Sequence, residues 1–95
     1  MKVLTVSVGE FRHFLHSRQG FVMHCYSKPN GKIVFLYECV YKDVTILFYE
    51  YELRELCDLF ETQFNLGRGD YIYTLYFEDC FFISCELGSN GRTAV

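Results

Sequence analysis

The sequence predicts an α+β fold, a single domain of two tandem β-α-β-β units forming a mainly antiparallel sheet with two helices on one face. The chain has 95 residues, which is enough for one hydrophobic core and too few for two. Apolar residues make up 51% of it and aromatic residues 19%, so a core can form without disulfides or a metal. A strand-helix-strand-strand pattern occurs twice. We expect a domain at residues 1–87, with pseudo-repeats 1–42 and 43–87, and a flexible tail at 88–95.

The first unit begins with a short strand, residues 2–6, and continues into a helix of about three turns. Ser7 and Glu10 have the S-x-x-E spacing of a capping box, which satisfies free N–H groups at a helix start. Gly20 suits the left-handed residue that follows a helix end. Apolar side chains recur at helical spacing within the helix, namely at Phe11, Phe14 and Leu15.

The rest of the first unit is predicted to be a β-hairpin. Residues 21–27 and 32–40 are rich in β-branched and aromatic side chains. Between them, Pro29 presets one turn dihedral, and Asn30 and Gly31 tolerate positive φ. These features predict two antiparallel strands with a tight turn.

The second unit repeats this order after a tight turn at residues 41–43. A strand at 44–49 precedes a helix at about 50–65, and a hairpin at 71–77 and 81–86 follows. A shift of 42 positions places Leu4 and Val6 on Ile46 and Phe48, which supports an internal repeat. The apolar stripe of the second helix consists of Leu53, Leu56, Cys57, Phe60 and Phe64.

Two helices can cover only one face of such a sheet, so the other face needs a different environment. Alternation along the strands separates the two faces. The face beneath the helices is predicted to be the core: Leu4, Val6, Phe21, Met23, Cys25, Ile33, Phe35, Ile46, Phe48, Tyr73, Leu75, Phe81 and Ile83. The opposite face mixes tyrosines with apolar and polar residues: Thr5, Val22, His24, Tyr26, Leu36, Glu38, Thr45, Leu47, Tyr49, Ile72, Thr74, Tyr76 and Glu86. This mixture is typical of a recognition surface, either buried by dimerisation or open to a foreign partner.

Charge is distributed unevenly along the chain. Residues 1–42 contain six Lys or Arg and two acids, whereas residues 43–95 contain three Lys or Arg and ten acids. The second helix carries an acidic face that could engage a basic groove on a partner, with an ordinary solvated face as the alternative. Its members are Glu52, Glu55, Asp58 and Glu61.

No pattern in the sequence predicts catalysis. Glu38 and Glu86 are better explained as solvated glutamates than as an acid–base pair. The histidines lack distinctive metal-ligand spacing, and the five cysteines form no C-x-x-C pair. We therefore expect no enzyme activity, no catalytic residues, no metal and no cofactor. The sequence shows neither a signal peptide nor a membrane span, so we expect a cytoplasmic location.

The preferred prediction is a non-catalytic protein-binding module. It would be either a homodimeric adaptor or a small, phage-type inhibitor of a larger nucleic-acid enzyme. The predicted binding residues are the tyrosine-bearing set Tyr26, Tyr49, Tyr76, His24 and Thr74 together with the acidic face. We expect a protein partner and self-association, but neither nucleic acid nor membrane as a partner. The alternative is a small-molecule sensor with a pocket between the repeats, lined by Tyr26, Tyr76, His24 and Thr74.

Overall fold

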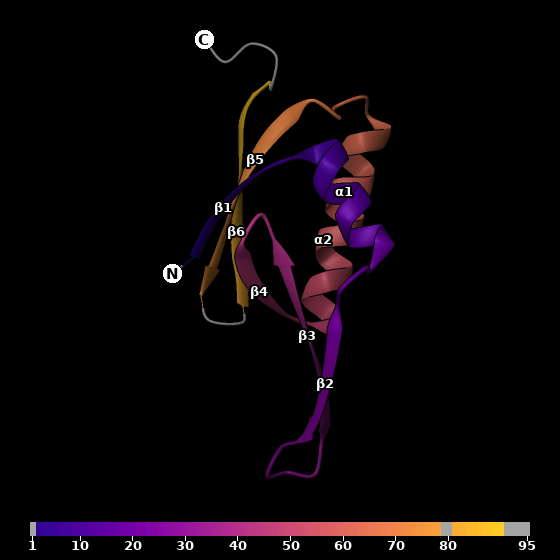
Figure 1. The fold of residues 1–95 in the computed structure, drawn as a ribbon, viewed down its shortest axis with the longest axis vertical. Helices are drawn as coiled ribbons and strands as arrows, with labels where there is room; N and C mark the ends of the chain where they lie inside the picture. The colour runs from indigo at the N-terminus through magenta and orange to yellow at the C-terminus, as the bar shows by residue number, and fades with distance from the viewer. Residues whose placement is uncertain (1, 79–80, 91–95) are drawn as a thin grey trace.

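The structure, a computed structural model, describes residues 2–78 and 81–90, with side chains described for residues 2–77. Its elements follow the predicted order, β-α-β-β twice (Figure 1). The chain is thus a small α+β domain with two helices and antiparallel strands in two small sheets. The elements are β1 (Lys2–Ser7), α1 (Val8–Ser17), β2 (Val22–Ser27), β3 (Ile33–Tyr41), β4 (Val44–Tyr49), α2 (Glu50–Asn65), β5 (Tyr71–Glu78) and β6 (Phe81–Asn90).

The prediction of a single sheet is wrong, because the described strands divide into two three-stranded sheets. One has the order β1-β5-β6 and the other the order β2-β3-β4. Lys42 and Asp43 both have positive φ, 48° and 66°, and form a two-residue turn that folds β4 back directly onto β3. β1 instead pairs antiparallel with β5 from the other half of the chain. The order of elements repeats between the halves, but the strand pairing does not.

The core lies between the helix pair and the inner faces of both sheets (Figure 1). Phe11 of α1 occupies its centre, with ring centroids 5.1 Å from both Phe60 of α2 and Tyr41 of β3. Edge-to-face arrangements of this kind add to the stabilisation from burial alone. Among the described side chains, the buried apolar residues of this core are Leu4, Val6, Val8, Phe11, Leu15, Cys39, Tyr41, Ile46, Phe48, Leu53, Leu56, Phe60, Tyr73, Leu75 and Phe77.

Both helices begin where the sequence predicts. The Ser7 hydroxyl accepts a hydrogen bond of 3.2 Å from the Glu10 N–H at the start of α1, which confirms the capping residue. α1 ends at Ser17, and its C-cap Arg18 is left-handed (φ 54°). The predicted Gly20, two residues later, is also left-handed (φ 79°). α2 has the predicted bounds. Neither helix in the described part of the chain combines the length and apolar character that a membrane crossing requires.

The β2–β3 hairpin extends well beyond the helices, and the molecule is elongated, 50 × 25 × 21 Å (Figure 1). The reason lies in the pairing of β3 with β4. β4 ends at Tyr49, opposite Leu36 of β3, and α2 begins at the next residue and runs away from the hairpin tip. The part of β3 before Leu36, with its partners on β2, therefore lies beyond the start of α2 and has no helix above it. We call this part, residues 22–35, the arm.

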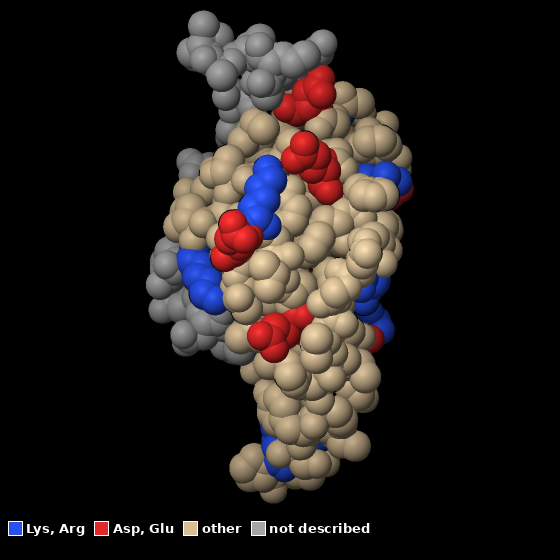
Figure 2. Space-filling view, in the orientation of Figure 1, with Lys and Arg blue, Asp and Glu red and all other residues tan. Residues whose placement is uncertain are grey.

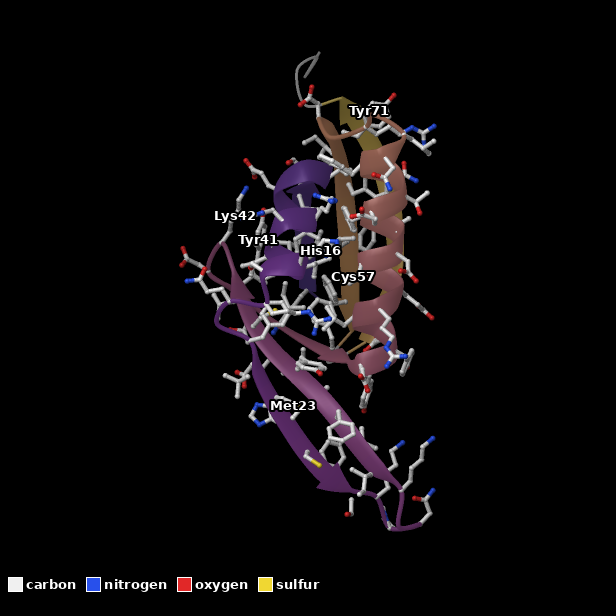
Figure 3. All side chains as sticks on the ribbon, turned by 90° about the vertical axis from the view of Figure 1, so that its right-hand side faces the viewer. His16, Met23, Tyr41, Lys42, Cys57 and Tyr71 are labelled. Carbon is white, nitrogen blue, oxygen red and sulfur yellow. The ribbon has the colours of Figure 1, made fainter. Side chains whose placement is uncertain are left out.

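Four residues predicted to be core lie on the arm and are exposed instead: Met23, Cys25, Ile33 and Phe35. Figure 3 shows Met23 on the hairpin, away from both helices. Of the other predicted core residues, Phe21 packs partly buried against the core, whereas the side chains of Phe81 and Ile83 lie outside the described residues. β6 continues to Asn90, so residues 88–90 belong to the strand and not to the predicted tail. The rest of that tail, residues 91–95, also lies outside the described residues.

Candidate functional site

The arm is held as a hairpin by its turn. The Gly31 N–H donates to the Lys28 carbonyl at 2.8 Å, and the Lys28 N–H donates to the Lys32 carbonyl at 2.8 Å. Gly31 is left-handed (φ 83°), as expected for a type I turn followed by a bulge. The Asn30 side-chain oxygen accepts from the Lys32 N–H at 2.9 Å. The predicted turn residues thus set the register of both strands.

Apolar side chains are exposed on both faces of the arm. All six residues of β2 are exposed, and large apolar residues on the arm have between 38% and 57% of their surface accessible. On the face that Figure 2 shows, the arm carries almost no charged side chains except near its tip. Single exposed apolar residues are common on proteins, whereas a large apolar patch is typical of an interaction site. The exposed large apolar residues of the arm are Val22 and Tyr26 on the face turned away from the helices, and Met23, Ile33 and Phe35 on the opposite face.

Three of the predicted binding residues share the outer face of this sheet, which is turned away from the helices. His24 pairs with Leu36, which pairs in turn with Tyr49, so the three side chains form one row across three strands. Tyr26 lies on the next row of the same face. The His24 ring nitrogen Nε2 lies 2.9 Å from Glu38 Oε1. The structure therefore brings Tyr26, His24 and Tyr49 onto one face, as the alternation predicts.

The other two residues of the predicted surface lie elsewhere. Thr74 and Tyr76 are half-buried on β5, which belongs to the β1-β5-β6 sheet. They pair with Thr5 and Val3 of β1. The predicted surface is therefore divided between two sheets, because β1 and β4 join different sheets.

β2 is an edge strand, and its outer edge has no partner strand among the described residues. Since Lys28 bonds to Lys32, the alternation of an antiparallel ladder makes Tyr26, His24 and Val22 the residues bonded to β3. The residues between them direct their backbone N–H and C=O groups away from β3. These outward residues are Met23, Cys25 and Ser27. An edge of this kind is a template for another strand.

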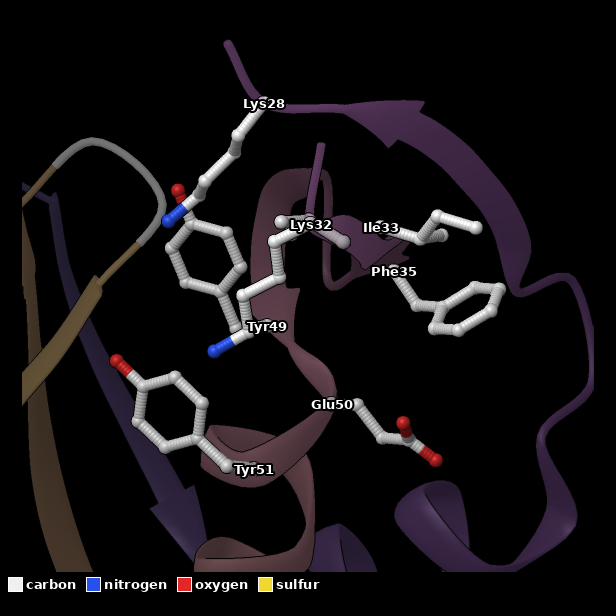
Figure 4. A pocket seen from close by; sticks show the side chains of 8 residues that line it. Lys28, Lys32, Ile33, Phe35, Tyr49, Glu50 and Tyr51 are labelled. Carbon is white, nitrogen blue, oxygen red and sulfur yellow. The ribbon is translucent and has the colours of Figure 1, made fainter. Parts of the chain in front are cut away.

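A cavity of about 330 Å³ lies between the arm and the start of α2, within the size range of ligand pockets. Tyr49 and Tyr51 stack nearly in parallel there, with ring centroids 5.9 Å apart and an interplanar angle of 6°. In Figure 4 the amines of Lys28 and Lys32 point toward these rings. The lining residues are Lys28, Lys32, Ile33, Val34, Phe35, Tyr49, Glu50 and Tyr51. Of the four residues predicted to line a pocket, none is among them.

The acidic face of α2 is smaller than predicted. Glu52 is buried, with 2% of its surface exposed, because its carboxylate accepts the Tyr49 N–H at 2.8 Å and caps the helix start. Its assignment to an exposed acidic face is wrong. Glu61 is bound between Arg12 and His16 of α1, with Arg12 Nη2 at 3.2 Å and His16 Nε2 at 3.1 Å. Two exposed acids remain, Glu55 and Asp58.

The perturbed titratable groups have structural causes. The Arg12 hydrogen bond is the main reason why the pKa of Glu61 lies below its ordinary value. Burial raises the pKa of the Cys39 thiol to about 12, with a smaller contribution from Glu38. Cys39 is therefore held as an unreactive thiol. Among the described residues, no group of three or more His, Cys, Asp or Glu side chains is placed to hold a metal ion.

No protein-family model matches this sequence, and no curated protein or solved structure matches it. Function therefore has to be inferred from the chain's own surface.

Sequence reasoning missed the arm as a site because it assigned Met23, Ile33 and Phe35 to the core. Alternation alone cannot distinguish a strand covered by a helix from one that extends past it. Element lengths carry part of that information. The nine residues of β3 span about 30 Å, more than the about 15 Å of the ten-residue α1 or the about 24 Å of the sixteen-residue α2. The absence of Lys, Arg, Asp and Glu from residues 22–27 is a second signal, since exposed edge strands usually carry a charge or a proline.

Proposed function

We propose that this chain is a non-catalytic protein-binding module and that the arm is its binding element. The observation that carries the proposal is the exposure of large apolar side chains on both faces of a hairpin whose outer strand edge has no partner in the described part of the chain. Tyrosine, phenylalanine and methionine, all found on the arm, are enriched in interface cores. The remaining acids of α2 make a small patch, so the arm and not α2 is the element that we assign to the partner.

Strand addition fits this surface in two ways. Backbone hydrogen bonds to Met23, Cys25 and Ser27 would supply affinity. Side chains on the two faces of the arm would supply specificity, with Tyr26 on one face and Phe35 on the other. The rest of the domain anchors the arm, because the inner end of β3 is buried through Cys39 and Tyr41.

Affinity capture from lysate of the source cells tests the proposal with matched variants. The arm variant is Met23→Ser combined with Ile33→Ser, and the control is Leu66→Ser. Leu66 is as exposed as Ile33, at 59% against 57%, but lies at the end of α2. We expect wild type and control to retain the same bound protein, whether a foreign protein or additional copies of the chain, and the arm variant to lose it. Equal retention by all three would contradict the assignment to the arm.

The cavity supports a second candidate function, the binding of a small ligand. Two parallel phenol rings and two lysine amines suit a planar molecule that carries a carboxylate or phosphate. Glu50 also lines the cavity, but its Oε1 lies 3.2 Å from Arg54 Nη2, which partly neutralises it. Thermal-shift measurements with benzoate, adenosine monophosphate and inorganic phosphate test this idea. Stabilisation of wild type that is lost in Lys28→Ala/Lys32→Ala would support a ligand site, and no shift with any probe would exclude these ligands.

A further inference from the structure

The free edge of β2 is suited to one partner in particular, a second copy of the same strand. We propose that two chains associate through antiparallel pairing of their β2 strands, with the two-fold axis passing between the two Cys25 residues. This inference rests on the proposed function, because it specifies what the arm binds. The two sheets would then join into one six-stranded sheet, β4-β3-β2 followed by β2-β3-β4 of the second copy.

The hydrogen-bonding groups of β2 are compatible with this symmetry. A two-fold axis perpendicular to the sheet keeps equivalent faces together, so each pair across the junction must join residues of the same face. With the axis at Cys25, the two Cys25 residues pair with each other, and Met23 pairs with Ser27 of the second copy. These are the residues whose N–H and C=O groups point outward. Their pairing would form about six inter-chain hydrogen bonds.

Charge complementarity favours this register over the one centred on His24. It places Lys28 of the second copy opposite Val22, and Val22 pairs with Glu38 within its own sheet. All three side chains lie on the outer face. Two strand spacings, about 10 Å in total, separate the backbones of Lys28 and Glu38, and the two side chains together can span this distance. A register with the axis at His24 would place Lys28 opposite Gly20 of the second copy and would place the two His24 side chains opposite each other. The Cys25 register thus brings Lys28 of each copy within reach of Glu38 of the other, beside the contact that Glu38 already makes with His24, and places no like charges opposite each other.

The available area indicates a weak, reversible dimer. The exposed apolar side chains next to the junction are those of β2, Val22, Met23 and Tyr26, which are 42% to 54% exposed, whereas Ile33 and Phe35 lie on β3, one strand away from it. Interfaces smaller than about 1,200 Å² are typical of weak, transient association, so the dimer should form mainly at high protein concentration. The isologous contact also closes on itself, so it does not propagate into fibres.

Residues 22–27 lack the devices that keep edge strands apart. They include no proline, lysine or other charged residue, and their pairing with β3 contains no register shift. Every copy of the chain presents the same complementary edge. Two copies of the chain therefore supply all the backbone groups that this pairing requires.

Light scattering across 1–500 µM protein is the first test, and thiol cross-linking is the second. We expect the mass to rise with concentration toward twice the 11.3 kDa of the chain. Diamide should join two Cys25 thiols as a disulfide while diamide itself is reduced to the hydrazine, since paired strands hold the two Cα atoms ~5.5 Å apart. The cross-linked dimer should be lost in Cys25→Ser and retained in Cys57→Ser. Cys57 is the control because it lies on α2, away from the arm.

Charge-swapped variants test the register without relying on a thiol. Met23→Lys/Ser27→Lys and Met23→Glu/Ser27→Glu should each be monomeric, because paired positions then carry like charges. An equimolar mixture should recover a dimer at least tenfold tighter than either variant alone. Circular dichroism controls for folding, and all four substitutions are at exposed positions of β2.

A monomer at every concentration would overturn the second copy as the partner. So would a dimer that is indifferent to the charge swaps and whose diamide cross-link persists in Cys25→Ser. If the chain is monomeric but the Met23→Ser/Ile33→Ser variant still loses a foreign protein in the capture experiment, the arm remains the binding element and only the self-pairing fails. If captured proteins do not depend on the arm, both proposals fail.

Discussion

The contrast between Ile33 and Ile46 gives a direct measure of how far the arm stands outside the core. Both isoleucines belong to the β2-β3-β4 sheet, but Ile46 is 1% exposed and Ile33 is 57% exposed. Ile46→Ala removes fully buried atoms and leaves a cavity, so it should cost about 2–5 kcal/mol. Full burial of an isoleucine contributes ~1.5–3 kcal/mol, and Ile33 buries less than half of its surface, so Ile33→Ala should cost about 1 kcal/mol or less.

Urea denaturation followed by circular dichroism measures both values. The experiment belongs at 1–2 µM protein, where self-association contributes little to stability. With a slope of ~2 kcal/mol/M, the middle of the range for small proteins, Ile46→Ala should lower the urea midpoint by about 1–2.5 M and Ile33→Ala by about 0.5 M or less. Equal shifts would refute the reasoning, because they would mean that the outer end of the hairpin is packed as tightly as the core.

Three further predictions follow from named side chains. The pKa of Glu61 is lower in the folded protein than its ordinary value, so its contribution to stability is present above the unfolded-state pKa and is lost as the pH falls through the folded pKa. Glu61→Gln should therefore flatten the decline of the urea midpoint between about pH 5 and pH 3. Cys25 is exposed and Cys39 is buried with a pKa of about 12, so maleimide should label Cys25 first and Cys39 only in urea, as mass spectrometry of digests can show. Glu52→Ala removes the acceptor of the Tyr49 N–H and should cost about 1 kcal/mol, lowering the melting temperature by ~4–8 °C, whereas an unchanged value would mean that water replaces the cap.

Local patterns predicted the order and type of the elements because each pattern depends on neighbours in sequence. The capping serine, the apolar spacing and the Asn30–Gly31 turn act over a few residues, and the structure contains the elements that they predict. The bounds of α2 agree with the prediction for the same reason. Glu52 was misassigned because helical periodicity places it on the polar side, whereas its capping bond draws it into the protein.

Strand pairing could not be predicted in the same way. The repeat suggested that equivalent strands occupy equivalent places, but the two-residue turn at Lys42 and Asp43 links β4 to β3. β1 follows no such turn and pairs with β5, more than sixty positions later in the sequence. This long-range choice depends on packing in three dimensions, which a single sequence does not display.

The core and the proposed binding surface share β3. Its inner end is anchored by Cys39 and Tyr41, whereas its outer end presents Ile33 and Phe35 to solvent. An isolated two-stranded hairpin is only marginally stable in water, so the arm depends on this buried inner end and on β4 for its order. Side chains beyond the helices then add little to folding and can be selected for contact with a partner. β3 thus contributes to the stability of the domain at its inner end and to the proposed binding surface at its outer end.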